Sequence, residues 1–191
     1  MRGNTYSKKQ SSEQISRKLS EFIKEIQYKN RNPVDNNVLK MLQEMETNPE
    51  LLFDSQQYLY RSRIVHSKDK LNGEYPFFGF GKDGSFVAPS ECTKDMRANY
   101  RYIPYLYCAT RPYLSVVEVR PRLGARVSVA RIRVNERLRL LDFSLQNYPK
   151  GMKPVKINLF YALSQLYSKP VTEDDDTLDY IPTQYIAEFV K

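Results

Sequence analysis

The spacing of hydrophobic residues changes near residue 57, and this change constrains the fold more than any other feature. Before it, apolar side chains recur every three or four residues, as in an amphipathic helix. After it come segments rich in aromatic and β-branched residues, and residues 127–134 alternate apolar with polar side chains, as in a half-buried strand. A chain with both patterns is expected to be an α+β protein.

Two helices are predicted in the first 56 residues, at 11–29 and 35–46. Ser11 and Gln14 have capping-box spacing, and Asn48-Pro49 ends the second helix. The apolar stripes are Ile15, Leu19, Phe22, Ile23 and Ile26 in the first helix and Val38, Leu42 and Met45 in the second. We interpret residues 1–56 as an N-terminal helical hairpin whose stripes pack into the core of a domain spanning residues 57–191, rather than forming a groove for a partner.

The rest of the chain predicts a mainly antiparallel mixed sheet with three helices. Strands are expected at 58–65, 77–80, 85–87, 105–109, 127–134 (with one possible bulge) and 138–143, with Lys82-Asp83-Gly84 as a hairpin turn. Helices are expected from Thr110 to Arg120, over 155–167 with Ile157, Phe160, Tyr161 and Leu163 buried, and from Pro182 onward. The acidic run 173–176 is expected to be a solvated loop. The last helix is still running at Lys191, which suggests a longer natural chain.

The scarcity of histidine and cysteine restricts the chemistry. His66 is the only histidine, and Cys92 and Cys108 are the only cysteines, so neither a zinc site nor a nucleophile–histidine pair is expected. The composition, 41% hydrophobic and 27% charged, is that of a globular protein. No apolar run approaches the ~20 residues that span a bilayer, and there is no secretion signal, so no membrane contact and a cytoplasmic location are expected.

The net charge of +8 is spread along the sequence. It is consistent with simple solubility, and it also suits an anionic ligand, either a nucleic acid or the phosphates of a nucleotide. Charge alone leaves these alternatives open.

Four features are candidates for a functional site: Tyr60-Arg61, Arg97-Ala98-Asn99, Leu106-Tyr107-Cys108-Ala109, and Glu118. Each also has a structural explanation. Arg61 fits an exposed position on a strand, Arg97 fits a loop, and Tyr107 fits a core. Glu118 lies among valines, where a carboxylate is costly to bury without a partner, so it is either a functional group or half of an ion pair.

In this order, the four features resemble the RES domain family. The family pattern begins with an aromatic-Arg strand and an Arg-x-Asn loop. It continues with an Ile-Pro that leads into a Leu-Tyr strand, here Ile103-Pro104-Tyr105-Leu106-Tyr107, and then with a glutamate in a Ser-x-x-Glu-Val helix. The resemblance covers residues 58–191, about two-thirds of the chain. The chain departs from the family pattern at three places. Met96 and Tyr102 stand where the family often has glycine, and the family serine is expected a short distance beyond Lys191.

The resemblance implies an ADP-ribosyltransferase-like fold with NAD+ as substrate and no metal. Members of the family are toxins of bacterial toxin–antitoxin pairs, and an antitoxin protein is the implied partner. They cleave the nicotinamide–ribose bond by phosphorolysis (an NAD+ phosphorylase, a glycosyltransferase reaction), by hydrolysis, or by transfer of ADP-ribose to a protein. The implied catalytic residues are Glu118 and Arg61, and the implied NAD+-binding residues are Tyr60, Arg61, Arg97, Asn99 and Tyr107.

The implied chemistry suits these residue types. A carboxylate stabilises the positive charge that develops on the ribose when nicotinamide leaves, and arginines bind a pyrophosphate through forked hydrogen bonds. Two other hypotheses are kept: a module that binds single-stranded nucleic acid, less favoured because the basic residues do not cluster, and a catalytically impaired interaction protein, since the serine is missing.

Overall fold

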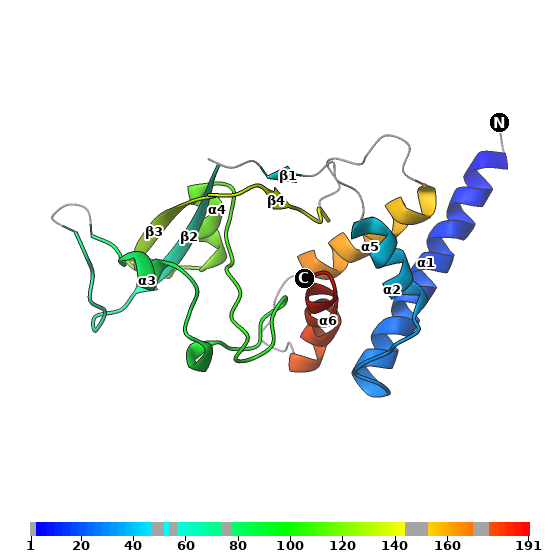
Figure 1. The fold of residues 1–191 in the computed structure, drawn as a ribbon, viewed down its shortest axis with the longest axis horizontal. Helices are drawn as coiled ribbons and strands as arrows, with labels where there is room; N and C mark the ends of the chain where they lie inside the picture. Colours follow the sequence, from blue (N-terminus) through cyan, green and yellow to red (C-terminus); the bar gives the residue numbers. More distant parts are fainter. Residues whose placement is uncertain (1–2, 47–51, 54–56, 74–77, 144–152, 170–175) are drawn as a thin grey trace. The chain divides into compact units, whose positions relative to one another are not determined.

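The computed structural model describes residues 3–46, 52–53, 57–73, 78–143, 153–169 and 176–191, and these form an α+β protein (Figure 1). The chain divides into two compact units. Unit 1 comprises Met1–Leu51, Asp95–Tyr100 and Leu140–Lys191, and unit 2 comprises Leu52–Lys94 and Arg101–Arg139. The N-terminal helices therefore share a unit with the C-terminal helices, so the units do not follow the sequence boundary between residues 56 and 57.

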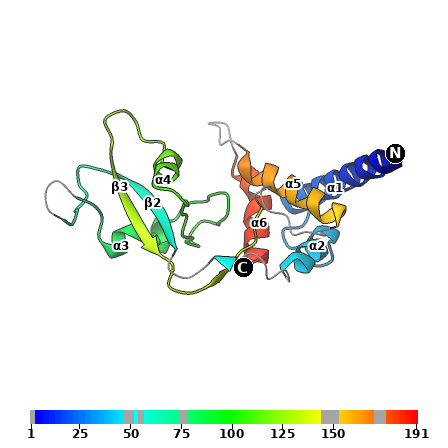
Figure 2. The same ribbon diagram turned by 90° about the horizontal axis from the view of Figure 1, so that it is seen from above.

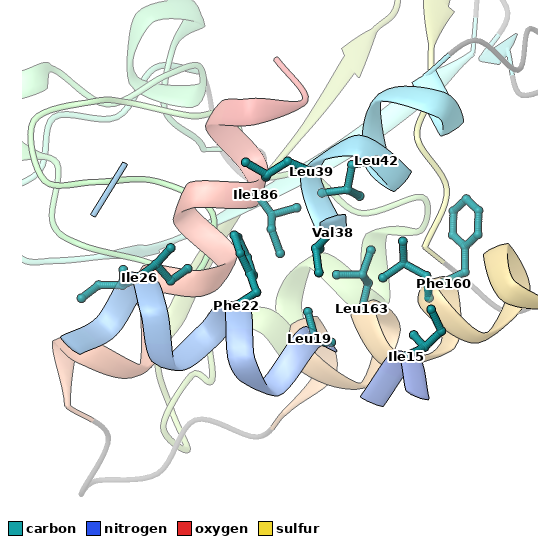
Figure 3. Packing of buried hydrophobic residues seen from close by; sticks show 12 residues of the cluster. Ile15, Leu19, Phe22, Ile26, Val38, Leu39, Leu42, Phe160, Leu163 and Ile186 are labelled. Carbon is teal, nitrogen blue, oxygen red and sulfur yellow. The ribbon is translucent and has the colours of Figure 1, made fainter. Parts of the chain in front are cut away.

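Unit 1 is helical. It contains α1 (Gly3–Tyr28), α2 (Asn37–Glu46), α5 (Pro154–Ser168), the 3-10 helix η2 (Thr177–Tyr180) and α6 (Ile181–Phe189). Figure 3 shows apolar side chains of α1, α2, α5 and α6 meeting in one cluster, in which Phe22, Ile26, Leu42, Leu163 and Ile186 are fully buried. The prediction that the stripes of the first two helices belong to a core is confirmed.

The starts of α1 and α2 differ from the predictions. Because α1 begins at Gly3, Ser11 lies inside the helix, and the Ser11–Gln14 spacing does not mark an N-terminus. The second helix begins at Asn37 because the side chain of Asn36 accepts a hydrogen bond from the Val38 amide, at 2.8 Å. The side chain of Met45 lies outside the described residues.

Helix α5 buries one face only. Leu159, Phe160 and Leu163 are buried, whereas Tyr161 is 54% exposed, so the prediction that Tyr161 is buried is wrong. Two residues along a helix is a rotation of about 200°, which directs Tyr161 away from the side that holds Leu159. Ile157 is half-buried.

The C-terminal part of unit 1 also departs from prediction in detail. Most of the acidic run 173–176 lies outside the described residues, but Asp176 caps η2 by accepting from the Leu178 amide. Helix α6 begins at Ile181, with Pro182 in its first turn, and ends at Phe189 rather than continuing to Lys191.

Unit 2 is built on a two-stranded antiparallel ribbon. Strand β2 (Tyr58–Val65) pairs with β3 (Arg126–Arg133) in unbroken register, from Tyr58 opposite Arg133 to Val65 opposite Arg126. The two predicted strands are confirmed, the second shifted by one residue and without a bulge. Short strands β1 (Leu52–Phe53) and β4 (Leu138–Arg139) form a second antiparallel pair, so the strand predicted over 138–143 is much shorter than expected.

Three further predictions for unit 2 need correction. Lys82–Ser85 forms the one-turn helix α3, not a hairpin turn, because the Ser85 amide bonds back to the Gly81 carbonyl; Phe77 lies outside the described residues. Within 105–109 only Ala109 pairs, with Tyr60. Helix α4 (Pro112–Glu118) has Arg111, not Thr110, at its N-cap. A 3-10 turn, η1 (Ser90–Cys92), completes the unit.

The two units differ in how much apolar surface they bury. Among the described residues, Val134 is the single buried hydrophobic residue of unit 2, and the other buried hydrophobic residues all belong to unit 1. The strand ladder and polar contacts therefore contribute more to holding unit 2 together than an apolar core does.

Candidate functional site

Strand β2 positions Tyr60 and Arg61. The Tyr60 amide donates to the Ala109 carbonyl, and the Ala109 amide donates to the Tyr60 carbonyl, both at 2.8 Å. This bridge holds the end of the 105–109 segment against the edge of β2 that does not pair with β3. Tyr107, two residues earlier, is 38% exposed. The structure therefore brings Tyr60 and the 105–109 segment together in unit 2, whereas the Arg61 side chain lies on the opposite side of β2 from Tyr60.

Side chains alternate across the ribbon, so Arg61 and its neighbour Ser62 face opposite sides. The buried Ser62 hydroxyl lies 2.7 Å from that of Ser115 on α4. Arg61 instead donates to the Phe86 carbonyl, and Arg63 donates to the Gly84 carbonyl, next to α3. Helices α4 and α3 lie on different sides of the ribbon (Figure 2).

The α3 side of the ribbon concentrates positive charge. Arg61 is half-buried, and burial together with the neighbouring Arg63 charge lowers the pKa of its guanidinium below the ordinary value. Burial raises the pKa of the Cys108 thiol, an effect that the Arg61 charge opposes. Two adjacent guanidinium groups, one partly desolvated, form a site that favours an anion. Arg63 was not singled out from the sequence, although its position two residues after Arg61 on a strand indicates the same face.

Glu118 is the last residue of α4, and it is exposed. The sequence placed this carboxylate among valines, where burial would be costly. In the structure its neighbour Val117 is 49% exposed, so this part of α4 is not buried. The inward-facing residue of this helix is Ser115, at 4% exposure. Because α4 covers the side of the ribbon away from Arg61, the structure does not bring Glu118 and Arg61 together.

Arg97 and Asn99 belong to unit 1, where both make structural contacts. Asn99 is buried, and its carbonyl accepts a hydrogen bond from the buried side-chain amide of Gln184 on α6, at 2.9 Å. The same Gln184 nitrogen donates to the Met96 carbonyl, also at 2.9 Å. Sequence reasoning missed Gln184, although it lies between Pro182 and Ile186 in a segment with a predicted apolar face.

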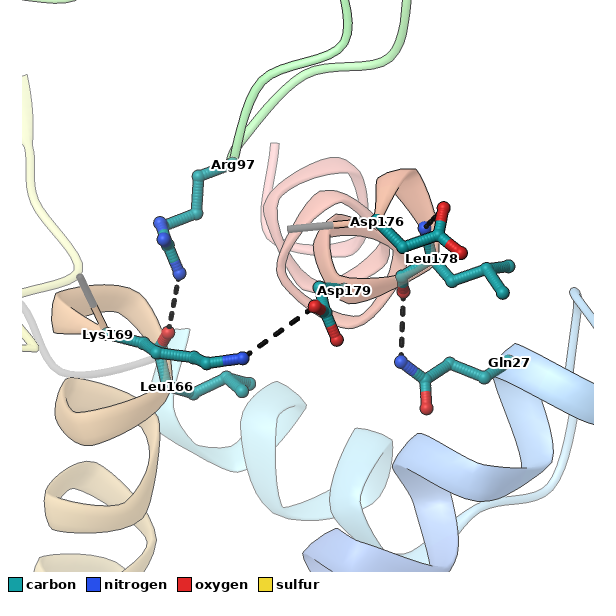
Figure 4. Close-up of polar contacts among 7 residues, drawn as sticks. All are labelled: Gln27, Arg97, Leu166, Lys169, Asp176, Leu178 and Asp179. Atoms are coloured by element: carbon teal, nitrogen blue, oxygen red, sulfur yellow. Dashed lines mark hydrogen bonds and ion pairs between the residues drawn. The ribbon is translucent and has the colours of Figure 1, made fainter. Parts of the chain in front are cut away.

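The Arg97 guanidinium lies at the C-terminal end of α5. Figure 4 shows it donating to the Leu166 carbonyl, at 3.1 Å, and its central carbon lies 5.6 Å from the Tyr180 ring centroid. A cation is favoured at a helix C-terminus, where the carbonyls lack helical partners. Its Nη2 atom is buried without a hydrogen-bond partner among the described residues. In the same view, Lys169 pairs with Asp179 at 3.7 Å, and Gln27 donates to the Leu178 carbonyl.

The described residues contain no group of three or more His, Cys, Asp or Glu side chains placed to hold a metal ion. Over the same residues, no helix has the length and apolar character needed to cross a membrane.

Fold and site together define an α+β protein with a helical unit and a basic ribbon unit. No protein-family model, no curated protein and no solved structure matches the chain.

Proposed function

We propose that this protein is an NAD+-consuming enzyme of the RES type, with an ADP-ribosyltransferase-like fold, in which unit 2 binds the pyrophosphate of NAD+. The observation that carries the binding step is the Arg61–Arg63 pair on the α3 side of the ribbon. A pyrophosphate placed there would offset the repulsion between the two guanidinium groups and would accept forked hydrogen bonds from them.

Tyr107 is consistent with the same ligand. Its side chain is 38% exposed, on the segment that the Tyr60–Ala109 bridge holds to β2. A dinucleotide carries two flat rings beside its phosphates, and in this proposal the Tyr107 ring stacks on one of them. Binding of NAD+ therefore rests on contacts within unit 2.

Cleavage of the nicotinamide–ribose bond rests on the RES resemblance. In this proposal the exposed carboxylate of Glu118 stabilises the oxocarbenium-like charge on the ribose, and nicotinamide leaves as a neutral group that needs no histidine acid. With Arg61 and Glu118 on different sides of the ribbon, cleavage also requires the end of α4 to move toward the bound ligand.

Binding is tested by calorimetric titration of the full chain with NAD+. Replacing Arg61 or Arg63 by Gln removes charge-assisted hydrogen bonds, and each variant is expected to bind at least about tenfold more weakly. Arg17→Gln is the matched control, because Arg17 is an exposed arginine of unit 1 whose ion pair with Glu21 contributes little. Absence of NAD+ binding, or equal affinity in all the variants, would refute the proposed site.

Cleavage is tested separately by nicotinamide release, with and without phosphate. Glu118→Gln is expected to lower the rate by about 100-fold or more, whereas Glu136→Gln, at another exposed glutamate of unit 2, is expected to leave it unchanged. Dependence on phosphate would identify phosphorolysis. Unchanged nicotinamide release by Glu118→Gln, or no release by the parent chain, would refute the proposed cleavage. Neither result bears on NAD+ binding, which the calorimetric titration tests.

A further inference from the structure

The net positive charge of the protein is confined to unit 2. This unit holds 15 of the 30 Lys and Arg residues but 7 of the 22 Asp and Glu residues, whereas unit 1 holds 15 of each and is neutral. The charge that looked evenly spread along the sequence is therefore concentrated by the fold, since residues 1–51, with a net charge of +2, and residues 140–191, with a net charge of −2, belong to the same unit and their charges cancel.

The basic residues of the second segment of unit 2 are all arginines. Arg101–Arg139 contains nine arginines, no lysine and two acidic residues, Glu118 and Glu136. Arginine binds phosphate groups through a planar fork of donors and its flat guanidinium stacks on rings, whereas lysine binds phosphate only as a point charge. This composition favours an extended phosphate ligand more than it favours simple solubility.

On the α4 side of the ribbon, arginines lie opposite tyrosines. The register pairs Arg133 with Tyr58 and Arg131 with Tyr60, and paired residues of an antiparallel ribbon share a face. The Arg131 guanidinium lies 4.5 Å from the centroid of the Tyr58 ring, and Tyr58 is 42% exposed. Arg131 and Arg133 are both exposed. We call Tyr58, Tyr60, Arg131 and Arg133 the arginine–tyrosine face.

We propose that the arginine–tyrosine face binds single-stranded nucleic acid. Arg131 and Arg133, about 7 Å apart along the strand, contact successive phosphates, while the Tyr58 ring stacks on a base. Stacking does not depend on the identity of the base, so little sequence preference is expected. This site lies on the side of the ribbon opposite Arg61 and Arg63, so it is separate from the proposed NAD+ site.

The test is fluorescence anisotropy of a labelled oligouridylate of about 20 nucleotides with the full chain, titrated at several salt concentrations. The double substitution Arg131→Gln/Arg133→Gln is expected to weaken binding at least tenfold and to reduce the slope of log affinity against log salt by about 1.4, since each phosphate contact contributes about 0.7. The matched control, Lys24→Gln/Lys29→Gln, removes two exposed charges from unit 1 and is expected to leave affinity and slope unchanged.

The aromatic contribution is tested with a second pair of variants. Tyr58→Leu is expected to weaken binding by about fivefold or more, and Tyr58→Phe is expected to bind as the parent does, because it retains the ring. Tyr161→Leu is the control, at an exposed tyrosine of unit 1. These surface substitutions are followed by circular dichroism, and Tyr58→Phe keeps the test interpretable if the leucine variant fails to fold.

Three results would overturn the proposal. The first is binding weaker than about 100 μM at low salt. The second is equal affinity of the arginine double variant and the parent. The third is binding of poly-glutamate or of duplex DNA as tightly as the single strand, which would indicate an acidic protein or a duplex as the partner.

Discussion

At the scale of single residues, the most consequential side chain outside the proposed sites is Gln184. It is 2% exposed, and its amide nitrogen donates to the Met96 and Asn99 carbonyls, which ties the 95–100 segment to α6. If the donor is removed, a buried carbonyl loses its hydrogen bond but stays shielded from water, and this destabilises the folded protein.

We expect Gln184→Leu to lower the free energy of unfolding by about 2–3 kcal/mol, measured by urea denaturation. Gln165→Leu makes the same chemical change at an exposed position on α5 and is expected to be nearly neutral. Equal effects of the two substitutions would contradict the role assigned to these hydrogen bonds.

Tyr100 predicts a pH dependence. Burial, and then the Glu188 charge, raise the pKa of its phenol above the ordinary 10.0. A raised folded-state pKa contributes stability that is complete below the unfolded-state pKa and is lost as the pH rises through the folded value. We therefore expect stability to fall above about pH 10, and to fall less steeply in Tyr100→Phe. Thermal melts across this range, with exposed Tyr28→Phe as control, would show whether the slope changes.

At the scale of elements, a pair of buried hydroxyls connects α4 to the ribbon. The Ser115 hydroxyl donates to the Pro112 carbonyl, at 2.7 Å, so it accepts from Ser62, whose hydroxyl lies 2.7 Å away. Each hydroxyl has one proton to donate, so the hydrogen bonds run in a single direction, from Ser62 to Ser115 to the Pro112 carbonyl. This order fixes the orientation of both side chains.

A double-mutant cycle measures this connection. Ser62→Ala and Ser115→Ala are each expected to destabilise the protein by about 1 kcal/mol, and the double variant by less than the sum, because both remove the same hydrogen bond. Chemical denaturation followed by a probe within unit 2 gives these values. Strict additivity would show that the two hydroxyls do not interact in solution.

At the scale of the whole molecule, the two units are stabilised in different ways. Unit 1 holds the apolar cluster around Phe22, Leu42 and Leu163, whereas unit 2 relies on the β2–β3 ladder and hydrogen bonds such as that between Phe80 and Ser128. Regions with few buried apolar contacts open at lower free energy.

We expect amide hydrogens of β2 and β3 to exchange faster than those in the buried turns of α1 and α5. NAD+ or the oligouridylate should slow exchange in β2 and β3, since a ligand that binds only the folded form stabilises it. Hydrogen-exchange mass spectrometry resolves the two units. Equal protection of both in the free chain would mean that unit 2 has a source of stability other than the described contacts.

Local sequence patterns were sufficient to predict the α+β class, the β2 and β3 strands, and the apolar stripes of α1 and α2. These follow from local periodicity, which residues such as Phe22 and Val127 carry without reference to distant segments. Short elements escaped prediction: α3 forms where a hairpin turn was expected, and the 105–109 segment pairs only through Ala109, because a single turn or bridge depends on what lies beside it.

Which side chains share a surface depends on contacts between segments far apart in the sequence. The RES-like features around Arg61, Arg97 and Glu118 follow one another in order along the chain, yet the fold places Arg97 in unit 1 and directs Arg61 and Glu118 to opposite sides of the ribbon. Strand alternation and long-range packing set these positions, and neither can be read from the order of the motifs. The same packing places the oppositely charged terminal segments in unit 1, where their charges cancel, and leaves the charge of +8 on unit 2.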